Sequence, residues 1–117
     1  MTHTVLVVED EQDLREMMRD ALELNGYAVV TAGNGQDAME KISHIENVCL
    51  VILDLFMPVM NGWDFIEQMR QRSDLASIPI VVHSSAPGPL PAGITRFLQK
   101  PILFDRLISI AQEYCRP

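Results

Sequence analysis

Side chains that could carry out chemistry follow short apolar runs at several points of the chain: Glu9, Asp10, Asp54, Ser84 and Lys100. If each run is a parallel strand, these side chains converge at the carboxyl edge of the sheet, where function collects in such folds. Neighbouring carboxylates repel one another unless a cation lies between them, and hard oxygen ligands suit Mg²⁺ or Mn²⁺. The set therefore predicts phosphoryl binding on Asp54, with a metal and Lys100 opposing the phosphoryl charge.

The elements that must position these side chains are visible as an alternation of two patterns. Short uninterrupted apolar runs suit a parallel sheet that is covered on both faces. They are Thr4–Val8, Ala28–Thr31, Val48–Leu53, Ile78–Val82 and, more weakly, Arg96–Gln99. The stretches between them carry apolar residues at helical spacing. Alternation of this kind predicts an α/β fold with right-handed crossovers.

The helical stripes differ in strength, and the first is the clearest. It consists of Leu14, Met17, Met18, Ala21 and Leu22, and Asn25-Gly26 follows as a stop signal. The later stripes are Ala38, Met39, Ile42 and Ile45, then Phe65, Ile66 and Met69, and finally Phe104, Leu107, Ile108 and Ala111. We expect the methionines of these stripes to fill the core.

The segment between the last two strands breaks this rhythm. Prolines 87, 89 and 91 alternate there with Gly88, Leu90, Ala92 and Gly93. An interior proline removes a hydrogen bond and clashes with the preceding turn, so no regular helix can run through the segment. We expect a loop with at most one turn near Leu90–Ile94.

Composition narrows the class of protein. The chain has 117 residues, 48% of them hydrophobic, and a net charge of −7. This predicts a single folded domain, residues 1–117, and argues against disorder. The few basic residues are scattered, which argues against direct nucleic-acid binding. No signal peptide is apparent, and the longest apolar run is too short for membrane insertion. We interpret Cys49 and Cys115 as reduced thiols of a cytoplasmic protein.

Four segments together resemble the receiver domain of two-component response regulators, as in chemotaxis receivers. They are Val5-Leu-Val-Val-Glu-Asp-Glu11, Val51-Ile-Leu-Asp-Leu-Phe-Met-Pro-Val-Met-Asn-Gly62, Pro79-Ile-Val-Val-His-Ser-Ser85 and Phe97-Leu-Gln-Lys-Pro101. The resemblance implies a flavodoxin-like, doubly wound sheet of five parallel strands in the order 2-1-3-4-5. The stretch from Ser84 to Lys100 is shorter than in the family, so we expect the fourth helix to be missing or vestigial.

The resemblance also implies a role for each site residue. Asp54 matches the phosphoacceptor, and Lys100 and Ser84 match the residues that assist catalysis by contacting the phosphoryl group. Glu9, Asp10, Asp54 and the backbone carbonyl of Phe56 match the ligands of Mg²⁺ or Mn²⁺, Glu9 through water. Ser84 and Phe97 match the pair that switches on phosphorylation, and Lys100-Pro101 matches a cis peptide.

The implied function is a phosphorylation-controlled signalling switch. A sensor histidine kinase or histidine phosphotransfer protein would donate the phosphoryl group, and a downstream protein would read the changed surface. The chain would then have no enzymatic activity beyond self-catalysed phosphotransfer and autodephosphorylation. Because the large ring of Phe56 lies near the acceptor, we expect slow loss of the phosphate.

Alternatives remain at the level of the molecule. A receiver-like scaffold that is never phosphorylated is one, and the shortened segment before Lys100 favours it weakly. A metal-dependent phosphohydrolase is another, but the second acid that such enzymes need is replaced by Phe56. A flavodoxin-like cofactor binder is a third, but Glu9, Asp10 and Glu11 would repel a phosphate.

Alternatives also remain for single residues. Asp10 could cap the first helix, Lys100 could be a solvated edge lysine, Ser84 a turn residue and Phe97 ordinary core. His83 points away from the face that Ser84 uses, so we expect it to fill space or form a hydrogen bond rather than take part in phosphotransfer. We expect Trp63 to be partly exposed, and His3 and His44 to lie on the surface.

Overall fold

The computed structural model describes residues 3–57, 59–85 and 92–115 of the chain. Its centre is a sheet of five parallel strands in the order β2-β1-β3-β4-β5. The strands are β1 (Thr4–Val8), β2 (Ala28–Ala32), β3 (Val48–Asp54), β4 (Ile80–Ser84) and β5 (Arg96–Gln99). The predicted fold class and strand order are confirmed.

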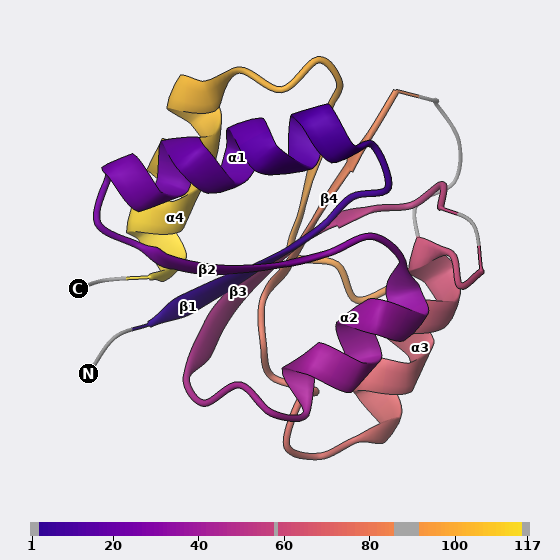
Figure 1. Cartoon of the computed structure of the whole chain (residues 1–117). Helices are drawn as coiled ribbons and strands as arrows, with labels where there is room; N and C mark the ends of the chain where they lie inside the picture. Colours follow the sequence, from indigo (N-terminus) through magenta and orange to yellow (C-terminus); the bar gives the residue numbers. More distant parts are fainter. Residues whose placement is uncertain (1–2, 58, 86–91, 116–117) are drawn as a thin grey trace.

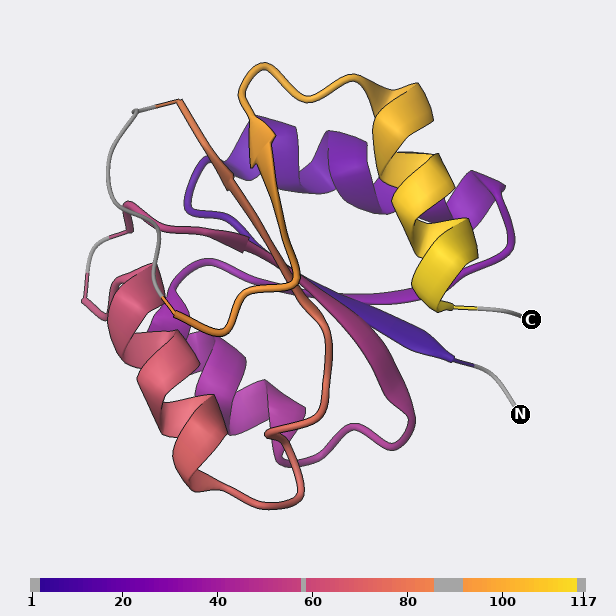
Figure 2. The same cartoon turned by 180° about the vertical axis from the view of Figure 1, so that it is seen from behind.

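Helices cover both faces of the sheet (Figure 1). They are α1 (Gln12–Leu24), α2 (Gly35–Ile42), α3 (Gly62–Gln71) and α4 (Phe104–Tyr114). α1 and α4 lie on one face and α2 and α3 on the other, as the view from behind also shows (Figure 2). The layers place the carboxyl ends of all strands at one edge, where the predicted site residues lie.

Two hydrophobic clusters form the core, one on each face of the sheet. The cluster under α2 and α3 includes Leu6, Val51, Val82, Phe65 and Met69. The cluster under α1 and α4 includes Val7, Ile52, Val81, Met18 and Leu107. Adjacent strand residues therefore alternate between the two clusters, as a pleated sheet requires. The central strands are buried on both faces, which explains their uninterrupted apolar sequence.

Two expectations about local structure were wrong, and one alternative role is excluded. β4 begins at Ile80 rather than Ile78, because Ile78 donates its N–H to Leu75 in a turn before Pro79. Met17 does not fill the core but is 52% exposed, since α1 presents it at the edge of its buried stripe. The N-cap of α1 is Glu11 without a side-chain hydrogen bond, so Asp10 does not cap the helix.

The connection from β4 to β5 contains no helix in its described part, which comprises Ser85 and residues 92–95. Residues 86–91, and with them the first two residues of the turn expected near Leu90–Ile94, lie outside the described residues. Thr95 joins the loop to β4 by donating its N–H to the carbonyl of Ile80. Only four helices are seen among the described residues, in agreement with the expected loss of the fourth helix of the family. None of them is long and apolar enough to cross a membrane.

The interpretation of the cysteines as reduced thiols was wrong, because Cys49 and Cys115 form a disulfide. Cys49 lies near the start of β3, and Cys115 directly follows α4; their Cα atoms are 5.3 Å apart. The parallel sheet brings the first residues of β3 under the last turn of α4. A sequence separation of 66 residues gave no local signal of this pairing.

Candidate functional site

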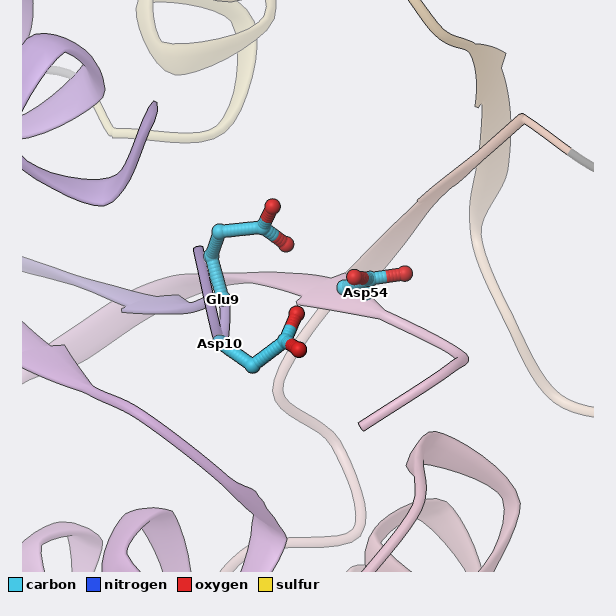
Figure 3. Close-up of side chains that lie close together, drawn as sticks. All are labelled: Glu9, Asp10 and Asp54. Carbon is cyan, nitrogen blue, oxygen red and sulfur yellow. The ribbon is translucent and has the colours of Figure 1, made fainter. Parts of the chain in front are cut away.

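Three carboxylates meet where β1 and β3 end (Figure 3). Glu9 and Asp10 follow β1, and Asp54 is the last residue of β3. One carboxylate oxygen of each lies within 4.8 Å of those of the other two. Glu9 and Asp54 are buried, whereas Asp10 is exposed. We call these three residues the acidic cluster.

Lys100, the residue directly after β5, joins the acidic cluster. Its Nζ donates hydrogen bonds to Glu9 Oε1 at 3.0 Å and to Asp54 Oδ2 at 3.3 Å. Its backbone N–H donates to the carbonyl of Ser84 at 2.9 Å, and the following peptide to Pro101 is cis, as expected. The lysine thus stands between two carboxylates that would otherwise repel each other.

The charges within this site shift two pKa values. Burial, together with the neighbouring carboxyl of Asp54, raises the pKa of Glu9 to about 8, although Lys100 acts in the opposite direction. Burial acts to lower the pKa of Lys100, but hydrogen bonds and attraction from Glu9 and Asp54 outweigh it and raise that pKa. Lys100 is therefore charged at neutral pH, and the carboxyl group of Glu9 is largely protonated there in the absence of a metal.

The backbone after β3 holds Asp54 from the other side. The N–H of Phe56 donates to Asp54 Oδ1 at 3.2 Å. Gly62 packs so closely that an added Cβ would lie 2.8 Å from the carbonyl oxygen of Asp54 and 2.7 Å from the Cα of Leu55. Asn61 caps α3 by accepting the N–H of Asp64. The spacing of this motif therefore has a steric cause: only glycine fits at 62.

His83 lies beneath the site on the same face of the sheet as the acidic cluster. It is the register partner of Asp54 and fully buried, with its Nε2 3.9 Å from Glu9 Oε2. Burial and the charge of Lys100 lower the pKa of His83 to about 4, so the imidazole is neutral at pH 7 and forms no ion pair with Glu9. The expected hydrogen bond of His83 is not seen among the described residues.

The two predicted switch residues occupy neighbouring strands. Ser84 ends β4 and is buried, and Phe97 lies on β5, half-buried against the cluster under α2 and α3. Trp63 is also half-buried, as expected, and contacts the ring of Phe56 edge-on with centroids 5.2 Å apart. His44 is exposed and His3 is half-buried.

The residues present fit a hard divalent cation. The acidic cluster offers three carboxylates, and Glu9 Oε2 is buried without a hydrogen-bond partner among the described residues. An unpartnered carboxylate oxygen in such a place is costly unless a cation approaches it.

Sequence reasoning missed the part that Arg15 takes in the site. Its guanidinium donates to the carbonyl oxygen of Glu9 at 2.8 Å and so fixes the loop between β1 and α1. The signal was its position: Arg15 stands one residue after Leu14 of the buried stripe, within reach of the preceding loop.

Comparison with known proteins decides the family. A family model for the response regulator receiver domain matches residues 5–112. The chain belongs to this family. Among curated relatives it is 39% identical over 80 residues to a probable transcriptional regulator ycf27 of Cyanidium caldarium, and 37% identical over 79 residues to the response regulator SaeR of Staphylococcus aureus. These matches cover 68% and 67% of this chain but only 30% and 33% of the relatives, which are much longer.

Solved structures of receivers match nearly the whole chain. The chemotaxis protein CheY4 of Vibrio cholerae has a TM-score of 0.88 at 29% identity, covering 97% of this chain and 99% of that one. A response regulator receiver protein from Pseudomonas putida has a TM-score of 0.89 at 27% identity, covering 97% and 98%. Receiver domains are signalling domains of two-component systems, and the family uses Mg²⁺ at an acidic pocket.

Proposed function

We propose that the chain, acting as a single receiver unit, is a switch that accepts a phosphoryl group on Asp54 from a histidine kinase or a histidine phosphotransfer protein. The observation that carries this proposal is the position of Lys100, whose Nζ is shared between Glu9 and Asp54 above the acidic cluster. An ammonium held at an acceptor carboxylate is placed to attract the oxygens of an incoming phosphoryl group.

The proposed transfer has two bond changes. A carboxylate oxygen of Asp54 forms a bond to phosphorus, and the bond from phosphorus to the donor's imidazole nitrogen breaks. The electron pair of that bond remains on the imidazole, and the product is an acyl phosphate on Asp54. Lys100 follows the negative charge by moving its hydrogen bonds from the two carboxylates to the phosphoryl oxygens.

Glu9, Asp10, Asp54 and the carbonyl of Phe56 would hold Mg²⁺ or Mn²⁺. When bound, the cation offsets the charge of the carboxylates and of the phosphoryl group. Asp10 is exposed and Glu9 is buried, so a cation would reach the acidic cluster past Asp10.

We infer that Ser84 and Phe97 pass the change to a downstream partner. Ser84 ends the strand beside Asp54, and the ring of Phe97 stands on the adjacent strand, where it is only half-buried. For the phosphoryl donor, two exposed apolar side chains offer contacts beside the site: Phe56, whose backbone N–H donates to Asp54, and Met17, which lines a pocket together with Lys100.

The test is intact mass after incubation with Mg²⁺ and acetyl phosphate. We expect the wild-type chain to gain the mass of one phosphoryl group, and to show no gain when EDTA is added before acetyl phosphate. Asp54→Asn should show no gain, while Ser85→Ala, at an exposed neighbouring hydroxyl, should behave as wild type. A gain in Asp54→Asn would refute the assignment. No gain in wild type, from acetyl phosphate or from a phosphorylated histidine phosphotransfer protein, would favour the scaffold.

A further inference from the structure

The strand that carries Ser84 also carries a buried imidazole that the proposed phosphotransfer does not use. Both ring nitrogens of His83 are buried and lack a hydrogen-bond partner among the described residues, as does Glu9 Oε2. Glu9 Oε2 and His83 Nε2 face each other at 3.9 Å. Three unpartnered polar atoms thus lie together under the acidic cluster.

This arrangement is unfavourable for the fold alone. A buried polar group without a partner destabilises a protein, and an apolar side chain of similar shape avoids that loss. Neighbouring positions on the same face, Val81 and Leu98, are apolar and pack into the cluster under α1 and α4. The histidine at position 83 therefore does not stabilise the metal-free protein, and a functional role would explain its presence.

We propose that His83 is a positioning residue for Glu9, holding its carboxylate in the orientation that serves the metal. Glu9 is held on one oxygen by Lys100 and faced on the other by His83. Once Glu9 is ionised, as metal binding requires, the neutral imidazole can donate its Nε2–H to Oε2 after a small rotation of the carboxylate. The longer side chain of glutamate, compared with aspartate, is what brings the carboxylate within reach of His83.

The positioning of Glu9 by His83 becomes more important once Asp54 is phosphorylated. This part of the inference rests on the proposed function. Lys100 then turns to the phosphoryl oxygens, and Glu9 loses the hydrogen bond to its Oε1. Arg15 donates to the backbone carbonyls of Glu9 and Asp10, and no hydrogen bond of the described residues joins it to the Glu9 carboxylate. His83 remains beside the Glu9 carboxylate, 3.9 Å from its Oε2, and offers it an N–H donor, whereas the neighbouring carboxylates of Asp10 and Asp54 repel it.

The experiment measures Mg²⁺ affinity of the unphosphorylated chain, with Trp63 fluorescence and calorimetry as independent readouts. Trp63 is the only tryptophan, and it contacts Phe56 beside Asp54. Loss of a residue that orients a metal ligand typically weakens binding by about 10–100-fold, and we expect a rise in Kd of that order for His83→Val. Thermal unfolding in EDTA should show an unchanged or higher Tm, because the unpartnered nitrogens are gone.

Two further variants separate positioning from a merely structural effect. His83→Gln restores an N–H donor at the position of Nε2 and should recover part of the affinity. In a Glu9→Asp background the shorter carboxylate cannot reach His83, so His83→Val should change Kd by less than about twofold. Equal losses in both backgrounds, unchanged affinity in His83→Val, or a lower Tm without loss of affinity would overturn the inference. Absence of Mg²⁺ binding by the wild-type chain would overturn the metal part of the proposed function as well.

Discussion

At the scale of single residues, the fold holds the carboxyl groups of the acidic cluster close together and partly buried, which makes their ionised forms unfavourable. Glu9 is fully buried, and its pKa is about 8 because burial and Asp54 outweigh the attraction of Lys100. Glu9 therefore binds a proton over most of the neutral range in the metal-free protein. A cation must displace that proton, which links metal binding to pH.

The first prediction follows from this linkage. As pH rises from 6.5 to 8, Glu9 gives up its proton more readily, so the Kd for Mg²⁺ should fall by up to about tenfold per pH unit and level off above pH 8. Calorimetric titrations at pH 6.5, 7.5 and 8.5 measure it. The control is Glu9→Gln, which carries no titrating group and should show a much flatter profile. A wild-type Kd that is constant over this range would contradict the prediction.

Phe56 carries the second prediction at this scale. Its side chain is 53% exposed beside the acceptor, and its backbone N–H donates to Asp54. We expect a large ring there to hinder a water molecule that attacks the acyl phosphate. Phe56→Ala should lose the phosphate several times faster than wild type, in a mass time course after removal of acetyl phosphate.

A matched aromatic substitution separates bulk from other effects. Phe56→Tyr keeps the ring and the contact with Trp63, and it should keep the slow rate. If Phe56→Ala and wild type lose the phosphate equally fast, the ring does not hinder the attacking water.

At the scale of elements, the loop from β3 to α3 fixes the acceptor by close packing. Replacing the first residue of a helix from glycine to alanine usually favours the helix. At Gly62 the new Cβ would meet the Cα of Leu55 and the carbonyl of Asp54, and backbone atoms cannot move aside cheaply. Gly62→Ala should therefore destabilise the fold by about 1–3 kcal/mol and slow phosphorylation.

The control for Gly62 is Gly33, whose added Cβ would meet only the Arg15 guanidinium at 3.4 Å. Gly33→Ala should leave both the urea unfolding midpoint and the phosphorylation rate close to wild type. Equal effects of the two substitutions would show that the close approach at Gly62 is unimportant.

Elements were also the scale at which the sequence was most informative. Apolar runs identified β1 to β4, and helical stripes identified the four helices. The signal for β5 was weaker, because Arg96 and Gln99 at the ends of this edge strand are exposed. Errors arose where tertiary context decides. The apolar stripe of α1 includes more residues than the face of the helix that packs on the sheet, so Met17 is exposed. In β4, a turn before Pro79 moves the start of the strand to Ile80.

The site was predictable in its acids and its lysine because strand ends share one edge. The contact between His83 and Glu9 was not, because we compared the direction of His83 with that of Ser84 only. Register decides the matter: His83 pairs with Asp54, and parallel partners point to the same face. The register between strands depends on the packing of the whole sheet, so it cannot be predicted from the sequence of a single strand.

At the scale of the whole molecule, the disulfide ties the last helix to a central strand of the sheet. It joins the start of β3 to the end of α4, at the edge of the sheet opposite to Asp54. Closing a loop of this size removes about 4 kcal/mol of chain entropy from the unfolded state, and measured gains commonly reach about 2–4 kcal/mol. Reduction should therefore lower the free energy of unfolding by about 2–4 kcal/mol, seen as a lower urea midpoint.

Reduction of the disulfide should leave the phosphorylation rate unchanged. In the described parts of the chain, residues 3–57, 59–85 and 92–115, no site residue contacts either cysteine. A double variant, Cys49→Ala with Cys115→Ala, separates the bond from the reagent. It should unfold at the midpoint of reduced wild type, ignore added reductant and accept a phosphoryl group at the wild-type rate. If reductant shifts the variant as much as wild type, the disulfide is not the source of the stability. If the variant is stable but poorly phosphorylated, the disulfide end of the fold is coupled to the acidic cluster through β3, the one strand that carries both Cys49 and Asp54.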